Sequence, residues 1–401
     1  MTLPFIDTSS PSGPPKPAHG INLRALLEEM VSRNASDLHI VAGEKPKLRV
    51  DGDITNASSD TELTPKDTLQ LAYSVLTEQQ KKRFELEDEL DFSFGIANLA
   101  RFRGNVFKQR GCVSMVVRQI PFAIKTFDQL GLPGSIAKMA EKPRGLVLVT
   151  GPTGSGKSTT LAAMIDKINR ERKGHIITVE DPIEFIHKHQ SCIINQREIG
   201  SDTKSFANAL KYALREDPDI ILVGEMRDLE TIAATLTIAE TGHLAFATLH
   251  TNSAAEAINR IIDVFPSHQQ SQVRAQLAFV LEGIVTQTLL PKATGRGRVM
   301  AAEILVVTPA IRALIRDDKV HQIYSSMQAG KKFGMQTLND ALYQLYMARE
   351  VTADECLRVS GDPTEFQRMI GQLPTEDDGS GKPASAKPAT ARPGAGSPVR
   401  R

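Results

Sequence analysis

Cysteine is scarce in this chain of 401 residues, which contains only Cys112, Cys192 and Cys356. None of the three lies near another in the sequence, and no pair has the CxxC spacing. A disulfide framework and a structural zinc site each need several closely placed cysteines, so the sequence argues against both. We expect three reduced thiols, as in proteins of a reducing compartment.

Long apolar runs and an excess of one charge are also missing. No apolar run approaches the roughly 18 residues of a membrane-spanning helix, and the N-terminus lacks the basic region and apolar core of a secretory signal. We therefore expect a cytoplasmic protein with no transmembrane segment. Lys and Arg number 48 against 47 Asp and Glu, a net charge of +1, so we expect no nucleic-acid partner.

Composition divides the chain into two folded parts between two low-complexity ends. The two ends, residues 1–19 and 374–401, are rich in proline and small residues, and we predict that both are disordered. The C-terminal end is also basic, so it is either simply solvated or able to bind anionic lipid. Residues 20–120 mix helical and strand patterns and predict a small α+β domain. Residues 121–125 are a plausible link to a larger domain at 126–373.

Periodicity predicts the elements of both domains. In the first, one helix, two short strands, a helical stretch and long antiparallel strands are expected at 21–34, 36–40, 46–54, 64–86, 88–96 and 100–120. In the second, apolar strands near 146–150, 175–181, 219–225 and 243–250 alternate with helices near 157–170, 203–215, 228–240 and 253–263. Such alternation predicts an α/β fold with a mainly parallel sheet. After about 265 we expect mostly helix, with one strand near 300–307.

The segment LVLVTGPTGSGKSTTL joins a predicted strand to a predicted helix through a glycine-rich loop. Its spacing satisfies the pattern GxxxxGK[ST], in which glycines let backbone N–H groups surround phosphate oxygens. The helix N-terminus adds positive potential, a lysine reaches the β and γ phosphates, and a serine hydroxyl binds Mg²⁺. The sequence therefore predicts ATP binding with Mg²⁺ by the loop residues Gly151, Thr153, Gly154, Ser155, Gly156, Lys157, Ser158 and Thr159.

Hydrolysis also needs a group that activates water, and acidic residues follow two of the predicted strands. Glu180, Asp181 and Glu184 come just after the strand at 176–179, where parallel strands open onto a ligand crevice. A carboxylate there can polarise the attacking water. They could equally be surface acids beside Pro182, and position alone does not decide between these readings.

The second acidic site lies in DIILVGEMRD, which is similar to a Walker B element. The aspartate that usually follows the apolar run is replaced by Gly224. Glu225 is therefore expected to act on the metal directly or through a water molecule. The alternative is an ordinary surface acid at the end of a strand.

Two histidines and three arginines are further candidates. His243 and His250 lie at the two ends of a predicted strand that adjoins the same crevice, so one or both could sense phosphate. Histidines are more often structural, and no third residue has the spacing of a metal ligand.

Arg101 and Arg103 share a strand face, and Arg118 lies on the next strand. They are either solvated charges or arginine fingers that reach a γ-phosphate from the same or a neighbouring subunit.

Six segments occur together in an order that is specific to one group of proteins. They are ASDLHI, ARFRGN, GPTGSGKSTT, TVEDPIEF, LREDPDIILVGEMRDLET and TGHLAFATLHTNSA. Their combination resembles the secretion ATPase superfamily, which powers type II secretion and type IV pili. The resemblance covers residues 21–350.

Within that superfamily the chain looks most like the ATPases of pilus retraction and twitching motility. No additional domain precedes the small one, and the tetracysteine zinc element of assembly and secretion ATPases is missing. AIRALIRDDK, at 310–319, is similar to the AIRNLIRE signature of retraction ATPases, from which it departs at Ala313 and Asp317. The same segment also reads as an amphipathic core helix, and both readings can hold.

The resemblance implies a PAS-like N-terminal domain, a RecA-like ATPase domain and a homohexameric ring with ATP between subunits. It implies that Glu184 is the general base, that Glu225 is the Walker B glutamate, and that His243 and His250 form the His box. It places Arg101, Arg103 and Arg118 at the nucleotide.

As partners, the resemblance implies an inner-membrane pilus platform protein and other pilus ATPases. The protein would then lie peripherally at the inner membrane. The alternatives are a pilus extension or type II secretion ATPase, an accessory retraction-ATPase paralogue and, against the neutral charge, a nucleic-acid translocase.

Overall fold

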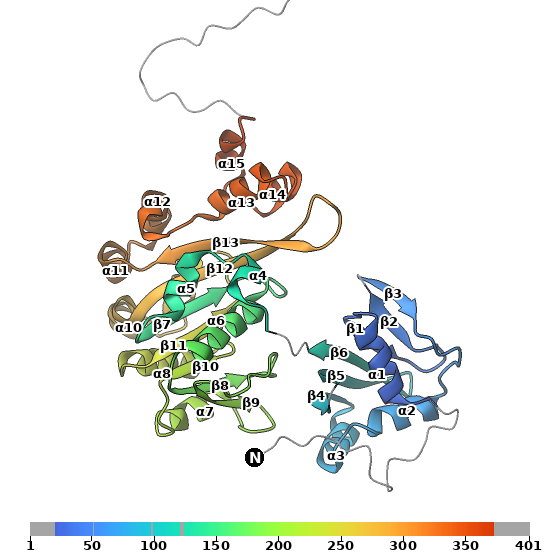
Figure 1. Cartoon of the computed structure of the whole chain (residues 1–401). Coiled ribbons are helices and arrows are strands. Elements are labelled where there is room, and N and C mark those ends of the chain that lie inside the picture. Colours follow the sequence, from blue (N-terminus) through green and yellow to red (C-terminus); the bar gives the residue numbers. More distant parts are fainter. Residues whose placement is uncertain (1–20, 51, 98, 121–123, 373–401) are drawn as a thin grey trace, which may run out of the picture.

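The structure is a computed structural model that describes residues 21–50, 52–97, 99–120 and 124–372. Two β-sheets, each with its own helices, make up this part of the chain (Figure 1). The predicted disordered ends, and residues 121–123 of the predicted link, lie outside the described residues. The α/β fold class, with a smaller N-terminal α+β domain followed by a domain with a mainly parallel sheet, is confirmed.

The N-terminal sheet has six strands in the order β3-β2-β1-β6-β5-β4, and all neighbouring strands are antiparallel. The strands are β1 (Asp37–Ile40), β2 (Lys47–Val50), β3 (Asp53–Asn56), β4 (Glu89–Ile96), β5 (Ala100–Gln109) and β6 (Cys112–Ile120). The helices that share a core with them are α1 (Leu23–Ser32), α2 (Pro65–Tyr73) and α3 (Glu78–Glu87). Alternation of buried and exposed residues along β4 leaves one face of this sheet for the core.

Aromatic residues fill the centre of this core. Phe102 is fully buried, and its ring stacks on Phe94 with centroids 5.4 Å apart. Phe94 stacks in turn on Phe92. Such pairs add to the stabilisation from burial alone.

We expect Phe102→Ala to lower the free energy of unfolding by about 3–5 kcal/mol, because it removes a buried ring and leaves a cavity that the sheet cannot close. Chemical denaturation followed by circular dichroism would measure the loss. As a control, Leu86→Ala changes a side chain that is 86% exposed and should shift stability by less than about 0.5 kcal/mol. Equal losses in the two variants would contradict this view of the core.

The second sheet has seven strands in the order β13-β12-β7-β11-β10-β8-β9. All neighbours pair in parallel except β12 and β13, which form an antiparallel hairpin. The strands are β7 (Gly145–Thr150), β8 (His175–Glu180), β9 (Ile193–Glu198), β10 (Ile220–Val223), β11 (Leu244–Leu249), β12 (Leu281–Pro291) and β13 (Arg298–Val306). Its central strands are buried on both faces, as expected for a parallel sheet covered by helices.

Helices cover both faces of this sheet, and their apolar sides meet alternate residues of the strands. Two pack on one face with Val147 and Phe246: α5 (Gly134–Ala140) and α6 (Lys157–Glu171). Those on the other face, with Leu146 and Ala245, include α7 (Phe206–Ala213), α8 (Leu229–Glu240), α9 (Ala254–Asp263), α10 (Ser267–Val280), α11 (Pro309–Arg316) and α12 (Ile323–Ala329). The short elements of the domain are α4 (Phe127–Leu130) and the 3-10 turns η1 (Val320–Gln322) and η2 (Lys331–Phe333).

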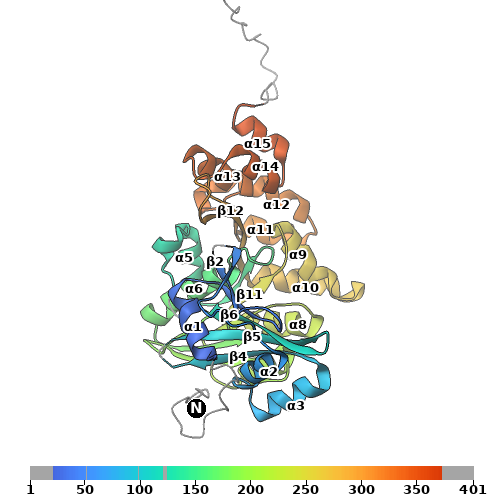
Figure 2. The ribbon, with the colours of Figure 1, turned by 90° about the vertical axis from the view of Figure 1, so that its right-hand side faces the viewer.

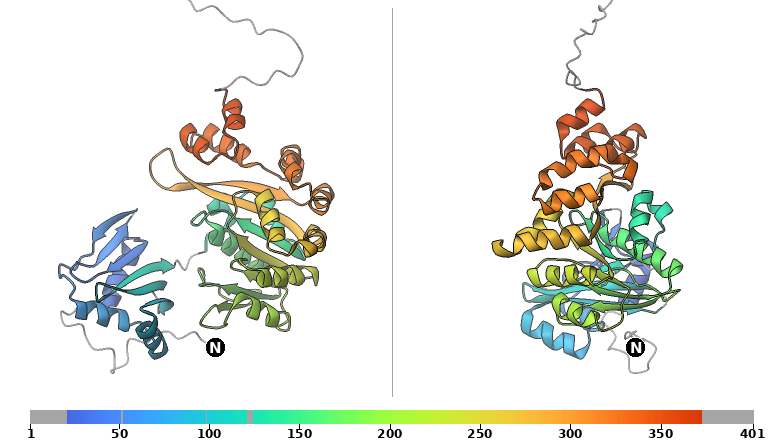
Figure 3. Two further views of the ribbon diagram at one scale, coloured as in Figure 1. Left: turned by 180° about the vertical axis from the view of Figure 1, so that it is seen from behind. Right: turned by 90° about the vertical axis from the view of Figure 1, so that its left-hand side faces the viewer.

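Three further helices form a separate small core on the β12–β13 hairpin. They are α13 (Leu338–Met347), α14 (Ala353–Val359) and α15 (Pro363–Met369). Figure 3 shows them at the end of the molecule that lies farthest from β8 and β9. Strands β4, β5 and β6 of the N-terminal sheet lie on the side where β8 and β9 are found (Figures 1 and 2).

Local sequence predicted most of these elements, but three strands and one helix break were not expected. The segment 46–54, predicted as one strand, contains β2 and the start of β3, which pair with each other. The stretch 64–86 forms two helices, since Thr77 caps α3 with a capping box. Strand β9 was not predicted at all. The prediction of mostly helical structure after 265 was wrong for 281–291, which forms the long strand β12.

Candidate active site

Four adjacent parallel strands bring the predicted site residues to one edge of the second sheet. Strands β7, β11, β10 and β8 run in the same direction, so their carboxyl ends meet at that edge. The loop 151–156 follows β7, Glu225 follows β10, His250 follows β11, and Glu180 ends β8. The topology therefore gathers groups that are up to a hundred residues apart in the sequence.

The glycine-rich loop has a backbone that only glycine can adopt at its first position. Gly151 has a φ of +135°, and a Cβ there would lie 2.3 Å from the carbonyl oxygen of Gln287 and 2.6 Å from Oγ of Ser155. Helix α6 begins at Lys157, directly after Gly156, so the loop leads into a helix N-terminus. This is the arrangement that presents backbone N–H groups to a phosphate.

Lys157 lies buried at the start of α6, and its Nζ donates hydrogen bonds to the carbonyl oxygens of Gly151 and Pro152, at 2.8 and 3.1 Å. Burial lowers the pKa of Lys157, while the charges of Glu225 and Glu184 act in the opposite direction. Both carboxylates are thus close enough to the lysine for their charges to act on it. Lys157, Glu225 and Glu184 therefore interact electrostatically.

Glu225 lies between a histidine and an arginine. Its Oε1 is 3.3 Å from Nε2 of His250, and its Oε2 accepts a hydrogen bond of 2.6 Å from Nη2 of Arg227. Burial acts to raise the pKa of Glu225, but the Arg227 hydrogen bond and the charges of His250, Arg227 and Lys157 hold it below the usual range. The carboxylate is therefore ionised at neutral pH, as an interaction with a metal ion requires.

Glu180 and Glu184 have different surroundings although both follow the same strand. Glu184 is exposed, and its backbone N–H points to Oε2 of Glu180 at 3.4 Å. Glu180 accepts hydrogen bonds from Thr178 and from Gln196, at 2.6 and 3.2 Å. Burial nevertheless raises the pKa of Glu180 to about 6. The Glu180 carboxylate, which accepts hydrogen bonds from neutral donors, is suited to holding the segment that carries Glu184. The Glu184 side chain itself is exposed to solvent.

The raised pKa of Glu180 predicts a pH dependence of stability. The folded state keeps this proton up to about pH 6, whereas the unfolded state loses it near 4.5, so stability falls as the pH rises between these values. Glu180→Gln should abolish that fall and stabilise the protein at pH 7.5 by about 2 kcal/mol relative to wild type. Denaturant unfolding at pH 4.5 and 7.5 would measure it. An identical fall in the variant would contradict the prediction, and Glu62→Gln, an exposed change, serves as control.

One residue beside the loop was missed by sequence reasoning. Gln287 on β12 is buried, and its Nε2 donates a hydrogen bond of 2.8 Å to Oγ1 of Thr160 on α6. No sequence signal pointed to it, because its strand was predicted as helix. Gly224 lies where β10 and β8 end close together, and a Cβ there would be 3.1 Å from Cα of Glu180. A side chain at this position, which the sequence comparison with a Walker B element singled out, would therefore crowd the end of β8.

Other predicted residues are not brought to this edge within one chain. His243 precedes β11, about 20 Å from the carboxyl end of that strand, and its Nδ1 lies 3.1 Å from both Oγ1 of Thr241 and the carbonyl oxygen of Ile238. These contacts place it at the end of α8. Its role at the nucleotide stays a prediction.

The three arginines all belong to the N-terminal sheet and contact carboxylates of this chain. Arg101 pairs with Glu198 of the second domain at 2.8 Å. Arg103 and Arg118 lie opposite each other on β5 and β6, and Arg118 pairs with Asp37 at 2.8 Å. Arg118 is exposed and Arg103 half-buried, so both can still reach a ligand.

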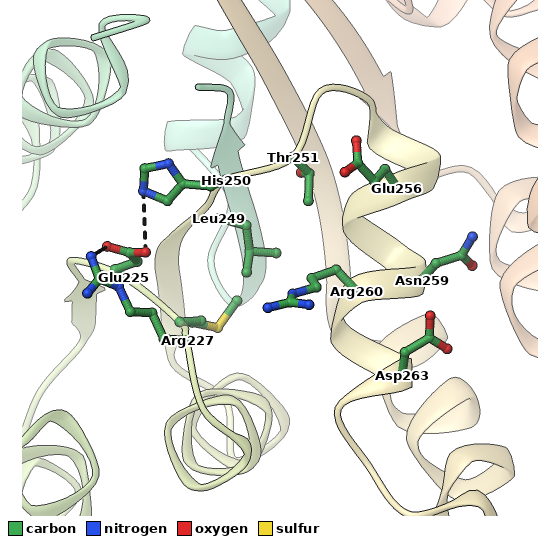
Figure 4. A pocket seen from close by; sticks show the side chains of 10 residues that line it. Glu225, Arg227, Leu249, His250, Thr251, Glu256, Asn259, Arg260 and Asp263 are labelled. Carbon is green, nitrogen blue, oxygen red and sulfur yellow. Dashed lines mark hydrogen bonds and ion pairs between the residues drawn. The ribbon is translucent and has the colours of Figure 1, made fainter. Parts of the chain in front are cut away.

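A cavity of about 630 Å³ opens beside Glu225 and His250 (Figure 4). Its walls come from the ends of β10 and β11 and from α9, where Arg260 and Glu256 face it, rather than from the glycine-rich loop. Oγ1 of Thr251 is buried in this wall and has no hydrogen-bond partner among the described residues. The cavity thus lies next to the phosphate loop and is distinct from it.

Comparison with known proteins agrees with this geometry. The family described as "Type II/IV secretion system protein" matches residues 20–358. The type IV pilus retraction ATPase PilT of Pseudomonas aeruginosa is 49% identical over 346 residues, which are 86% of this chain and 100% of that protein. The type IV pilus ATPase PilU of the same organism is 43% identical and covers 88% of this chain and 92% of its own.

A solved structure gives the same result. The crystal structure of the pilus retraction motor PilT with bound ADP has a TM-score of 0.82 and 51% identity, covering 87% of this chain and 99% of that one. Among the helices of the described residues, none has the length and apolar character that crossing a bilayer demands. The chain therefore belongs to the type II/IV secretion system protein family, and it is a P-loop ATPase.

Proposed function

We propose that this protein is the motor ATPase of type IV pilus retraction and works as a ring of six identical subunits. The observation that carries the proposal is the 49% identity to a pilus retraction ATPase over 86% of the chain. The segment AIRALIRDDK supports it through its similarity to the signature of retraction ATPases. Its residues up to Arg316 lie in helix α11, where Ile311 and Ile315 are buried. The protein would act at the cytoplasmic side of the inner membrane on a pilus platform protein.

The described residues fit a Mg²⁺–nucleotide complex. Ser158 lies in the first turn of α6, the ionised Glu225 lies near Lys157, and Oγ of Ser155 is buried with no partner among the described residues. Mg²⁺ takes few protein ligands and several oxygens from phosphates and water. Bound Mg²⁺ would neutralise charge on the phosphates.

Each residue then has a defined task in hydrolysis. The loop N–H groups and Lys157 bind the phosphates, and Ser158 and Glu225 would hold Mg²⁺, the glutamate directly or through water. Glu184 orients and polarises the attacking water, as its exposure at the strand edge allows. His250 orients Glu225 through their contact of 3.3 Å. Arg103 and Arg118 of the N-terminal domain contact the γ-phosphate and sense its loss.

Release of those contacts would let the two domains rotate relative to each other, which is a common way for ligand-driven motors to move. In the ring, such rotations would turn the platform protein and withdraw pilin subunits from the pilus. The second candidate is an accessory role beside another pilus ATPase, since the chain is also similar, at 43% identity, to a second type IV pilus ATPase of the same organism.

Deleting the gene in the source organism tests the proposal. We expect abundant surface pili and no twitching, because extension would continue without retraction. A bald surface would mean that the protein extends pili, and normal piliation with normal twitching would indicate the accessory role. Electron microscopy of surface pili together with a twitching assay on agar gives both readouts, and complementation with the wild-type gene is the control.

A further inference from the structure

A buried carboxylate at the end of β9 gathers groups from both domains. Glu198 is 6% exposed, and its Oε2 accepts a hydrogen bond of 2.8 Å from Nη2 of Arg101 on β5. Its Oε1 accepts a hydrogen bond of 2.7 Å from Oγ of Ser93 on β4, and the same arginine nitrogen donates to Ser93 at 2.8 Å. Three side chains thus form a closed triangle across the boundary between the two sheets.

The same carboxylate also holds the loop that carries Glu184. The backbone N–H of Ile183 donates to Oε2 of Glu198 at 3.2 Å, and the Ile183 side chain is 1% exposed. Ile183 directly precedes Glu184, so this hydrogen bond fixes the Pro182–Ile183 peptide, one residue before the glutamate. Glu198 is itself held through its N–H, which donates to Asp202 at 2.8 Å.

Charge and burial make this contact sensitive to the position of the N-terminal domain. Arg101 is only 9% exposed, so moving the arginine away would leave a buried carboxylate without its counter-charge. Such a group has to draw in water or shift its backbone. Either response changes how firmly Oε2 holds the Ile183 amide.

We propose that Glu198 is a positioning residue that couples the N-terminal domain to the water-orienting glutamate. This inference rests on the proposed function, in which Glu184 acts on water. With Arg101 and Ser93 in place, Glu198 holds the Ile183 peptide and keeps Glu184 at the site. When the N-terminal domain moves away, this hold loosens and hydrolysis slows. Arg101 therefore acts through Glu198 rather than on the phosphates.

Two single variants and their combination test the coupling. Glu198→Gln keeps the size of the side chain and removes its charge, and Arg101→Ala removes the counter-charge. We expect each to lower kcat roughly tenfold or more, with the Kd for ADP changed less than about twofold, because binding groups are untouched. The double variant should be no slower than the slower single variant, since both changes break one linkage. Arg101→Lys, which keeps the charge, should recover part of the rate.

Other roles for these residues predict different results. A purely structural contact would lower stability while leaving kcat per folded ring unchanged, so an unchanged kcat in Glu198→Gln would overturn the proposal. A direct phosphate contact by Arg101 would weaken nucleotide binding in Arg101→Ala and leave Glu198→Gln unaffected, which would also overturn it. Arg197→Ala is the matched control, because Arg197 lies beside Glu198 on β9 but pairs with Glu216, which follows α7. Loss of this ion pair should leave kcat unchanged.

The outcome can be separated from a failure of the proposed function. If the wild-type ring hydrolyses ATP and the gene deletion leaves a bald surface, the assignment to retraction fails while the kcat of Glu198→Gln still decides the coupling. If deletion leaves many pili without twitching and Glu198→Gln keeps the wild-type kcat, the coupling alone is wrong.

Discussion

Replacing Lys157 by alanine abolishes ATP turnover in our account. Lys157 is the cation of the glycine-rich loop, buried at the first turn of α6 and under the influence of two carboxylates. Without it, the β and γ phosphates lose their main positive partner, and negative charge from Glu225 and Glu184 lies near them uncompensated. We expect kcat to fall at least about a hundredfold, with weaker nucleotide binding.

Phosphate release by the purified protein measures this effect. Lys167→Ala is a matched control, because this lysine lies on the same helix and pairs with Glu171 on the surface. The control should keep the wild-type rate. Near-normal turnover in Lys157→Ala would remove the basis of the site assignment, whatever the fate of the other variants.

Replacing Glu184 by glutamine should separate binding from hydrolysis. The amide keeps the shape of the side chain but cannot accept a proton or polarise water as a carboxylate does. We expect kcat to fall by roughly 10²–10⁴, while the Kd for ATP stays close to that of wild type. Glu230→Gln, an exposed change on α8, should alter neither quantity.

The competing candidate for the general base is Glu180, four residues before Glu184. Burial raises the pKa of Glu180 to about 6. Rapid mixing of ATP with each variant distinguishes the two acids. Full activity in Glu184→Gln together with loss of activity in Glu180→Gln would transfer the role of base to Glu180. Loss of ATP binding in Glu184→Gln would instead show that this carboxylate is needed for the conformation of the glycine-rich loop.

Sequence reasoning located those parts of the site that are local in the chain. The loop 151–156, the acid after β10 and the acids after β8 each follow a strongly apolar strand, and parallel pairing then places them together. A P-loop needs only a short strand, a glycine pattern and a helix start, all of which lie within about twenty residues. The fold class followed from the same alternation of strands and helices.

The parts that could not be predicted depend on long-range packing, or no turn or capping signal in the sequence marks where they begin. Helix α10 runs directly into β12 at Leu281 with no turn between them, so its strand pattern was read as more helix. Gln287 lies on this strand, so it was missed as a residue of the site. Arg101 and Glu198 are separated by 97 residues, and only the packing of two domains brings their charges together. The strand between His243 and His250 was expected to bring one or both of them to the crevice. A strand places its two ends at opposite edges of a sheet, and only His250 follows the carboxyl end of β11.

The central claim is that hydrolysis at the glycine-rich loop powers pilus retraction. Imaging fluorescently labelled pili on living cells that lack the gene, and that carry either the wild-type or the Lys157→Ala form, tests it most directly. Our account predicts that pili shorten in cells with the wild-type protein and that they extend without shortening in cells with the variant. Shortening at the wild-type speed with Lys157→Ala would contradict the account.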